Sequence, residues 1–250
     1  IEQVTDEDGD IINKTTYNLP YGTDPPEGTT PASNLLSLSI AIFIAVIIML
    51  LLMKYKVEHF LRVWFLIVVI LAIAITLNAF LLKVQYGPFI SLAIAFPLGL
   101  YKIFRRNIIV HNITELFIYP GIAAVIVALL EKIWVAMVAL IILSVYDAYA
   151  VWHAGFMQKM AKYQIEQLKI FSGFFIPYIG RKERQRMRNL AKSERKNKKI
   201  KVHLAILGGG DVVFPMVLAG TVLHALGFIP ALLIAVAATI ALGWLFLMSK

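Results

Sequence analysis

Seven long apolar runs, separated by short polar turns, limit what this chain can fold into. A helix needs about 17–25 mostly apolar residues to cross a membrane, and each run has about that length. The runs cover residues 35–53, 60–82, 87–104, 110–130, 132–153, 202–226 and 228–248. Of all residues, 60% are hydrophobic, whereas a soluble domain has roughly 45–50%. The sequence therefore predicts an all-α fold, a polytopic membrane bundle of about seven helices.

Composition shifts divide the chain into four segments. Residues 1–34 are acidic and rich in turn formers, and residues 35–154 hold the first five spans. Residues 155–201 form a long polar insertion, in which the mixed stretch 157–180 would suit an amphipathic segment lying on the membrane face. Residues 202–250 hold the last two spans.

The distribution of Lys and Arg predicts the orientation, because cytoplasmic loops carry an excess of basic residues. If the acidic segment is outside, only Lys14, Lys83 and Lys132 of the 24 Lys and Arg residues are outside. The others are Lys54, Lys56, Arg62, Lys102, Arg105, Arg106, Lys250 and those of residues 155–201. We therefore expect a cytoplasmic 155–201 loop that is attracted to anionic lipid, and no nucleic-acid partner.

Residues that could hold a cofactor are scarce. There is no cysteine and there are five scattered histidines, so we expect no disulfide, no metal site and no bound cofactor. Asn13 and Asn112 match the glycosylation sequon, but Asn112 is expected on the inner half of a span, where no glycan could be added.

Two aspartates lie well inside the apolar runs, where a carboxylate costs about 2.5–3.5 kcal/mol on insertion scales. Asp147 is six residues before His153 at the inner end of its span, and Asp211 is nine residues after Val202. On helical rise their depths are about 9 Å and about 13 Å below the same surface. Glu115 is a third candidate, nearer the end of its span and better able to reach the interface.

The matched depth favours a shared chemical role for the two aspartates. A lone aspartate could simply join helices by hydrogen bonds. Two neighbouring carboxyl groups instead share a proton, so that one can act as a base while the other acts as an acid. Such a pair can deprotonate a water that attacks a peptide carbonyl and protonate the departing amine. Gly208, Gly209 and Gly210 would leave room in front of Asp211.

The motifs around these aspartates resemble those of a known family. Tyr146-Asp147 on one span and Gly208-Gly209-Gly210-Asp211 on the next are similar to the YD and GxGD motifs of the presenilin and signal peptide peptidase family, which are intramembrane aspartyl proteases. The segment LLLMKYKVEHFLRVW also resembles the inner turn between the second and third presenilin helices. The resemblance implies nine helices in the family, of which this chain would cover the second to the eighth.

One further motif of the family has an unexpected position here. The family carries a PAL motif on its ninth helix, near the aspartates, and Pro230-Ala231-Leu232 spells these letters. We expect this proline at the outer face, opposite the aspartates, as the residue that opens the last span. The alternative is a chain in which the intervening helix is not represented.

The resemblance and the dyad chemistry together predict an intramembrane aspartic endopeptidase. Asp147 and Asp211 would be catalytic, with Tyr146 and the three glycines in support. The expected partners are transmembrane-helix substrates and the bilayer, with a homo-oligomer left open. Because backbone bonds inside a helix are satisfied, a substrate must unwind locally, so cleavage should favour segments with Gly or Pro. Two alternatives remain: a prepilin-type peptidase, and a proton-coupled transporter or cation leak channel that uses the same carboxylates.

Overall fold

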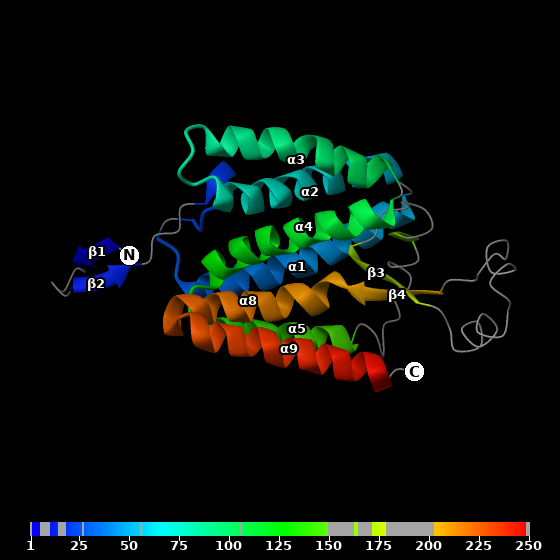
Figure 1. Cartoon of the computed structure of the whole chain (residues 1–250). Coiled ribbons are helices and arrows are strands. Elements are labelled where there is room, and N and C mark those ends of the chain that lie inside the picture. Colours follow the sequence, from blue (N-terminus) through cyan, green and yellow to red (C-terminus); the bar gives the residue numbers. More distant parts are fainter. Residues whose placement is uncertain are drawn as a thin grey trace, which may run out of the picture.

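The computed structural model of the chain is a helical bundle with a small two-stranded sheet beyond each end (Figure 1). It describes residues 2–5, 11–14, 19–26, 28–55, 57–105, 107–149, 163–164, 172–178 and 203–248. The helices in this part of the chain are α1 (Pro31–Lys54), α2 (Glu58–Phe80), α3 (Gly87–Phe104), α4 (Ile108–Leu130), α5 (Ile133–Tyr149), α8 (Gly209–Leu226) and α9 (Phe228–Met248), with a 3-10 turn η1 (Pro20–Gly22) before them. The strands are β1 (Glu2–Thr5), β2 (Ile11–Lys14), β3 (Gly173–Tyr178) and β4 (His203–Gly208).

These helices confirm the predicted polytopic bundle. Six of them are long and apolar enough to cross a membrane, and α5 is apolar but has 17 described residues. The chain is therefore an integral, multi-pass membrane protein. Each helix covers most of its predicted run, and the clearest difference is the start of the helix in the sixth run.

The sixth span begins later than predicted. Residues 203–208 were expected to be helical, but they form β4 and pair antiparallel with β3, in a register that joins Gly173 to Gly208 and Tyr178 to His203. A short apolar run cannot be assigned to helix or strand by periodicity alone. Gly208, at the end of this strand, and Gly209 and Gly210 after it disfavour extension of the helix backwards. Within the expected amphipathic stretch, residues 173–178 are strand, and most of the rest of 155–201 lies outside the described residues.

Local signals in the sequence set several helix ends. Thr30 caps α1 through a capping box with Ser33, which satisfies two backbone N–H groups that would otherwise lack partners. The side chain of Asn107 accepts from the backbone at the start of α4. Gly227 has φ +90° between α8 and α9, a backbone conformation that glycine adopts without steric cost.

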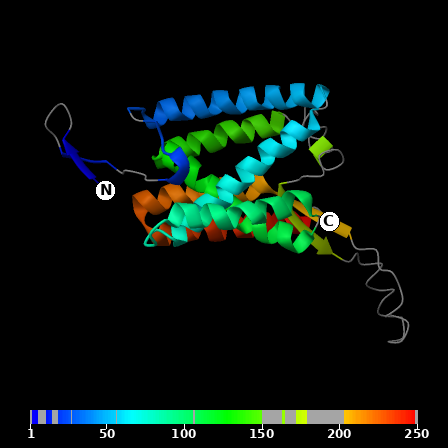
Figure 2. The same cartoon turned by 90° about the horizontal axis from the view of Figure 1, so that it is seen from above.

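The core of the bundle lies around α4, which packs on α2, α8 and α1. Gly121 allows α4 to approach α2 closely, because a Cβ atom there would lie 2.0 Å from the carbonyl oxygen of Ala72. Small residues permit such close contacts between membrane helices. Figure 2 shows α2 running obliquely across the bundle, with α1 along one side. The β3–β4 sheet lies at the end of the bundle opposite β1 and β2 (Figures 1 and 2).

Candidate active site

The two aspartates predicted to act together lie at the same end of neighbouring helices. Asp147 is in the last described turn of α5, and Asp211 is in the first turn of α8. These two helices pack on each other. Asp147 is close enough to act electrostatically on the carboxyl group of Asp211, and both residues are exposed at the protein surface. The two acids thus lie at corresponding ends of two packed helices.

The turn from β4 into α8 fixes the position of Asp211. Gly208 is both the last residue of the strand and the N-cap of the helix, so Asp211 is the third helical residue. Its carboxylate lies within hydrogen-bonding reach of the backbone N–H of Gly208. This is the reach of the acidic residue in a capping box. The expected depth of about 13 Å, counted on helical rise from Val202, is wrong because the helix starts at Gly209.

The three glycines have different surroundings. A Cβ at Gly209 would lie 3.1 Å from Ser172 Oγ and 3.1 Å from a ring carbon of Tyr119. At Gly210 the nearest atom, at 3.1 Å, belongs to the ring of Phe214 in the same helix. Of these three glycines, Gly209 is therefore the one whose added Cβ would meet residues outside α8, whereas at Gly210 it would meet a side chain of the same helix that can turn away.

An apolar cavity of about 550 Å³ adjoins Asp211. It lies between the sheet, α8 and α9, and its lining residues are Ile176, Leu207, Asp211, Val212, Pro215, Met216, Ala219, Ala235, Ala238, Thr239, Leu242 and Gly243. Asp211 is the one ionisable group in this lining. A cavity of this size and polarity can hold several apolar side chains next to a carboxylate.

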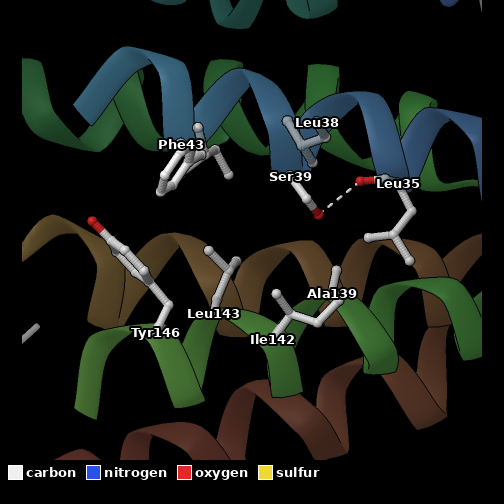
Figure 3. A pocket seen from close by; sticks show the side chains of 9 residues that line it. Leu35, Leu38, Ser39, Phe43, Ala139, Ile142, Leu143 and Tyr146 are labelled. Carbon is white, nitrogen blue, oxygen red and sulfur yellow. Dashed lines mark hydrogen bonds between the residues drawn. The ribbon is translucent and has the colours of Figure 1, made fainter. Parts of the chain in front are cut away.

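Tyr146 faces another part of the bundle. Its half-buried side chain extends from α5 towards Phe43 of α1 (Figure 3). It lines a cavity of about 190 Å³ between these two helices, with Leu38, Ser39 and Leu143 among the other residues. The sequence predicts Tyr146 as a residue that supports the two aspartates; in the structure its ring is directed into the α1–α5 cavity.

Glu115 differs from its predicted setting. It was expected to reach the interface, but its exposed fraction is 0%. Its Oε1 accepts a hydrogen bond of 2.6 Å from Lys102 Nζ on α3, and Lys102 is itself only 8% exposed. His111 Nε2 lies 3.4 Å from the same oxygen. The charge of Glu115 is thus compensated inside the protein, which is the usual condition for a buried carboxylate.

Sequence reasoning missed the contacts between α4 and β3. Asn112 Nδ2 donates to Phe175 O at 2.9 Å, and Phe175 N donates to Asn112 Oδ1 at 3.0 Å. His111 Nε2 donates to Gly173 O at 2.8 Å. The polar residues at 111, 112 and 115 within an apolar run were the signal that could have indicated these contacts. Asn112 was instead considered as part of a glycosylation sequon.

Pro230 lies in the first turn of α9, just after the turn at Gly227. That turn is at the opposite end of α8 from Asp211 (Figure 1). The position agrees with a helix-opening proline. It keeps Pro230-Ala231-Leu232 away from the aspartates in the described part of the chain.

One of the comparisons with known proteins gives a match. A family model described as "Signal-peptide peptidase, presenilin aspartyl protease" matches residues 22–249. Searches of curated proteins and of solved structures found no significant match. Within the described residues, no three His, Cys, Asp or Glu side chains gather where they could hold a metal ion.

Proposed function

Because the chain belongs to the signal-peptide peptidase and presenilin aspartyl protease family, we propose that it hydrolyses peptide bonds in transmembrane helices with Asp147 and Asp211 as its catalytic dyad. The observation that carries the proposal is the placement of these two acids on the packed helices α5 and α8, close enough to interact electrostatically. The family is one of aspartyl proteases, so an acid pair is the chemistry that its members require.

The reaction needs one proton on the pair. The ionised carboxylate takes a proton from a water molecule, and the water oxygen attacks the carbonyl carbon of the substrate. The neighbouring carboxylic acid donates its proton to the amide nitrogen, the C–N bond breaks, and an amine and a carboxylic acid leave. The two aspartates exchange their protonation states in each cycle, so no side-chain nucleophile is consumed.

The apolar cavity next to Asp211 supports a membrane-embedded substrate. A transmembrane helix has its backbone groups bonded internally and must unwind before a carbonyl is open to water. The cavity of about 550 Å³ could receive side chains of the unwound segment while Asp211 faces its backbone. We therefore expect cleavage sites to lie near Gly, Pro or other weak helix formers.

The test is proteolysis by the purified protein in liposomes. A single-span substrate with a central glycine pair is compared with a version in which both glycines are leucine. Asp147→Ala and Asp211→Ala should each abolish cleavage. Glu131→Gln, at the α4–α5 turn, is the matched control and should keep it. Undiminished cleavage by either aspartate variant would contradict the dyad.

The same liposomes separate the alternatives. A prepilin-type peptidase would cut at the membrane surface, so mass spectrometry of the products distinguishes it from an enzyme that cuts within the span. Proton or cation flux that persists without any peptidase activity would favour a transporter or channel.

We also propose that the N-terminal segment is outside and that the loop between β3 and β4 is cytoplasmic. Basic residues support this orientation. The C-terminal ends of α1 and α3, which carry Lys54 and precede Arg105, lie at the β3–β4 end of the bundle (Figure 1), and that loop is strongly basic in sequence. Single cysteines introduced into this cysteine-free chain, at the loop and at residue 24, can be labelled from either side of the membrane. Labelling of the loop from outside would overturn the orientation.

A further inference from the structure

The edge of β3 that faces away from β4 is covered by side chains of α4. Glu115 Oε1 accepts from Gly173 N at 3.4 Å, and His111 donates to Gly173 O. The amide of Asn112 bonds both the N–H and the carbonyl of Phe175. Four backbone groups of β3 thus receive partners from one helix, in the way that a neighbouring strand would supply them.

The alternation of the strand fits this arrangement. In an antiparallel pair, the backbone groups of successive residues point alternately towards the partner strand and away from it. Gly173 and Phe175 direct theirs towards α4, so the next outward position is Pro177, which has no N–H to satisfy. Proline is tolerated at such outward positions of a strand. Ring contacts add to the attachment, with centroids 4.7 Å apart for His111 and Phe175.

The attachment contains buried charge that stability alone does not explain. Lys102 and Glu115 form an ion pair with side chains 2% and 1% exposed. Burying both charges costs desolvation free energy, and an apolar pair of similar volume is often as stable or more stable. Glu115 Oε2 and the Tyr119 hydroxyl make no well-formed bond within the described residues. A costly arrangement of this kind is expected where it serves a specific geometry.

The attached strand is paired with the residue that directly precedes the helix of Asp211. Gly173 is paired with Gly208, the residue that precedes α8. Tyr119 of α4 packs edge-on against Phe174, with ring centroids 5.3 Å apart. The same ring lies 3.1 Å from the position that a Cβ of Gly209 would take. A shift of β3 relative to α4 would therefore move the turn that carries Asp211.

We propose that Lys102, His111, Asn112 and Glu115 form an edge clamp, a set of positioning residues that holds β3 against α4 and thereby sets the place of Asp211 relative to Asp147. The clamp does not touch the reacting atoms. Its effect on catalysis rests on the proposed function, whereas its effect on the geometry of the two aspartates does not.

The clamp predicts a loss of turnover without an equal loss of stability. Asn112→Ala removes two bonds at a half-buried position and should fold. Lys102→Met/Glu115→Leu removes both buried charges together, which avoids leaving one charge unpaired. Both variants should lower kcat by about 10-fold to 100-fold, the effect of displacing a catalytic group by about 1 Å. KM and the unfolding temperature should stay near those of the unmodified protein.

Thr114→Val is the matched control. Thr114 is buried next to Glu115, but within the described residues its hydroxyl donates only to carbonyl groups of its own helix, Val110 O and His111 O. It should keep kcat. Asn112→Asp, which keeps the acceptor for Phe175 N–H, should fall between Asn112→Ala and the unmodified protein. A decrease in kcat that simply follows the unfolding temperature through all variants would overturn the clamp.

A second measurement does not depend on activity. The chain has no cysteine, so an Asp147→Cys/Asp211→Cys protein carries one thiol pair. Its cross-linking rate with a short bifunctional thiol reagent reports how well α5 and α8 present these positions to each other. Adding Asn112→Ala should lower the rate severalfold, and adding Thr114→Val should not. Equal rates in the two backgrounds would refute the clamp even if the protein cleaves its substrate. A slowed rate would support it even if no substrate is cleaved.

Discussion

The close contact between α4 and α2 at Gly121 gives a sharp prediction for Gly121→Ala. The added methyl group would lie 2.0 Å from Ala72 O and 2.8 Å from Ala72 C. Both are backbone atoms, so no side-chain rotation can relieve the overlap. Ordinary contact begins at 3.4 Å, so α2 and α4 must separate locally by about 1.4 Å, the difference between 3.4 Å and 2.0 Å.

The cost follows from what this separation breaks. Overpacking of a well-packed interface costs about 1–3 kcal/mol. The bond between Thr76 Oγ1 and Phe117 O, which joins the same two helices at 2.5 Å, is worth about 0.5–1.5 kcal/mol. Alanine favours the helix over glycine by about 1 kcal/mol. We therefore expect Gly121→Ala to lower the free energy of unfolding by about 1–3 kcal/mol.

The assay is unfolding in detergent micelles, by heat and by a denaturing detergent, followed by circular dichroism. Gly243→Ala is the control, because a Cβ there meets nothing within 4 Å. It should be neutral or stabilising by about 0.5–1 kcal/mol. If Gly121→Ala is as stable as Gly243→Ala, the packing of α4 on α2 described above is wrong.

Other substitutions test the site and its surroundings. Gly209→Ala should reduce cleavage at least tenfold because its methyl group pushes on Tyr119, whereas Gly210→Ala should keep most of the activity; comparable losses in an initial-rate assay would refute this distinction. Lys102→Met should destabilise the protein by about 3–5 kcal/mol, since it leaves Glu115 buried without its cation. Chemical unfolding should show that the Lys102→Met/Glu115→Leu protein regains most of the stability that Lys102→Met loses. Equal instability of the single and the double variant would contradict the ion-pair explanation.

Much of the bundle could be predicted from the sequence because the length and apolar content of a span are properties of one continuous stretch of residues. The family resemblance drawn from the YD and GGGD motifs is confirmed by the match over residues 22–249. The start of the sixth span could not be predicted. Residues 203–208 are apolar enough for a helix, and their strand conformation depends on pairing with β3, about thirty residues earlier.

The surroundings of the aspartates were less predictable for the same reason. Lys102 was counted among the basic residues of the inner side, and Glu115 was expected to reach the interface. Only the packing of α3 on α4 brings them together as a buried pair. The role of Asn112 likewise depends on a strand far away in the sequence. The assignment of Asp147 and Asp211 as the catalytic pair remains a prediction.

The wall that α9 contributes to the cavity beside Asp211 consists largely of small side chains, including Ala235, Ala238 and Gly243. These positions offer a way to calibrate the site without altering either aspartate. A graded series at Ala238, from Val to Leu to Phe, would reduce the free volume in steps. Substrates with bulky residues near the scissile bond should be lost first and those with glycine last. The order of loss would rank natural substrates by the size of the residues near the scissile bond. A variant with a large side chain at Ala238 would then act only on a chosen substrate that has small residues at these positions.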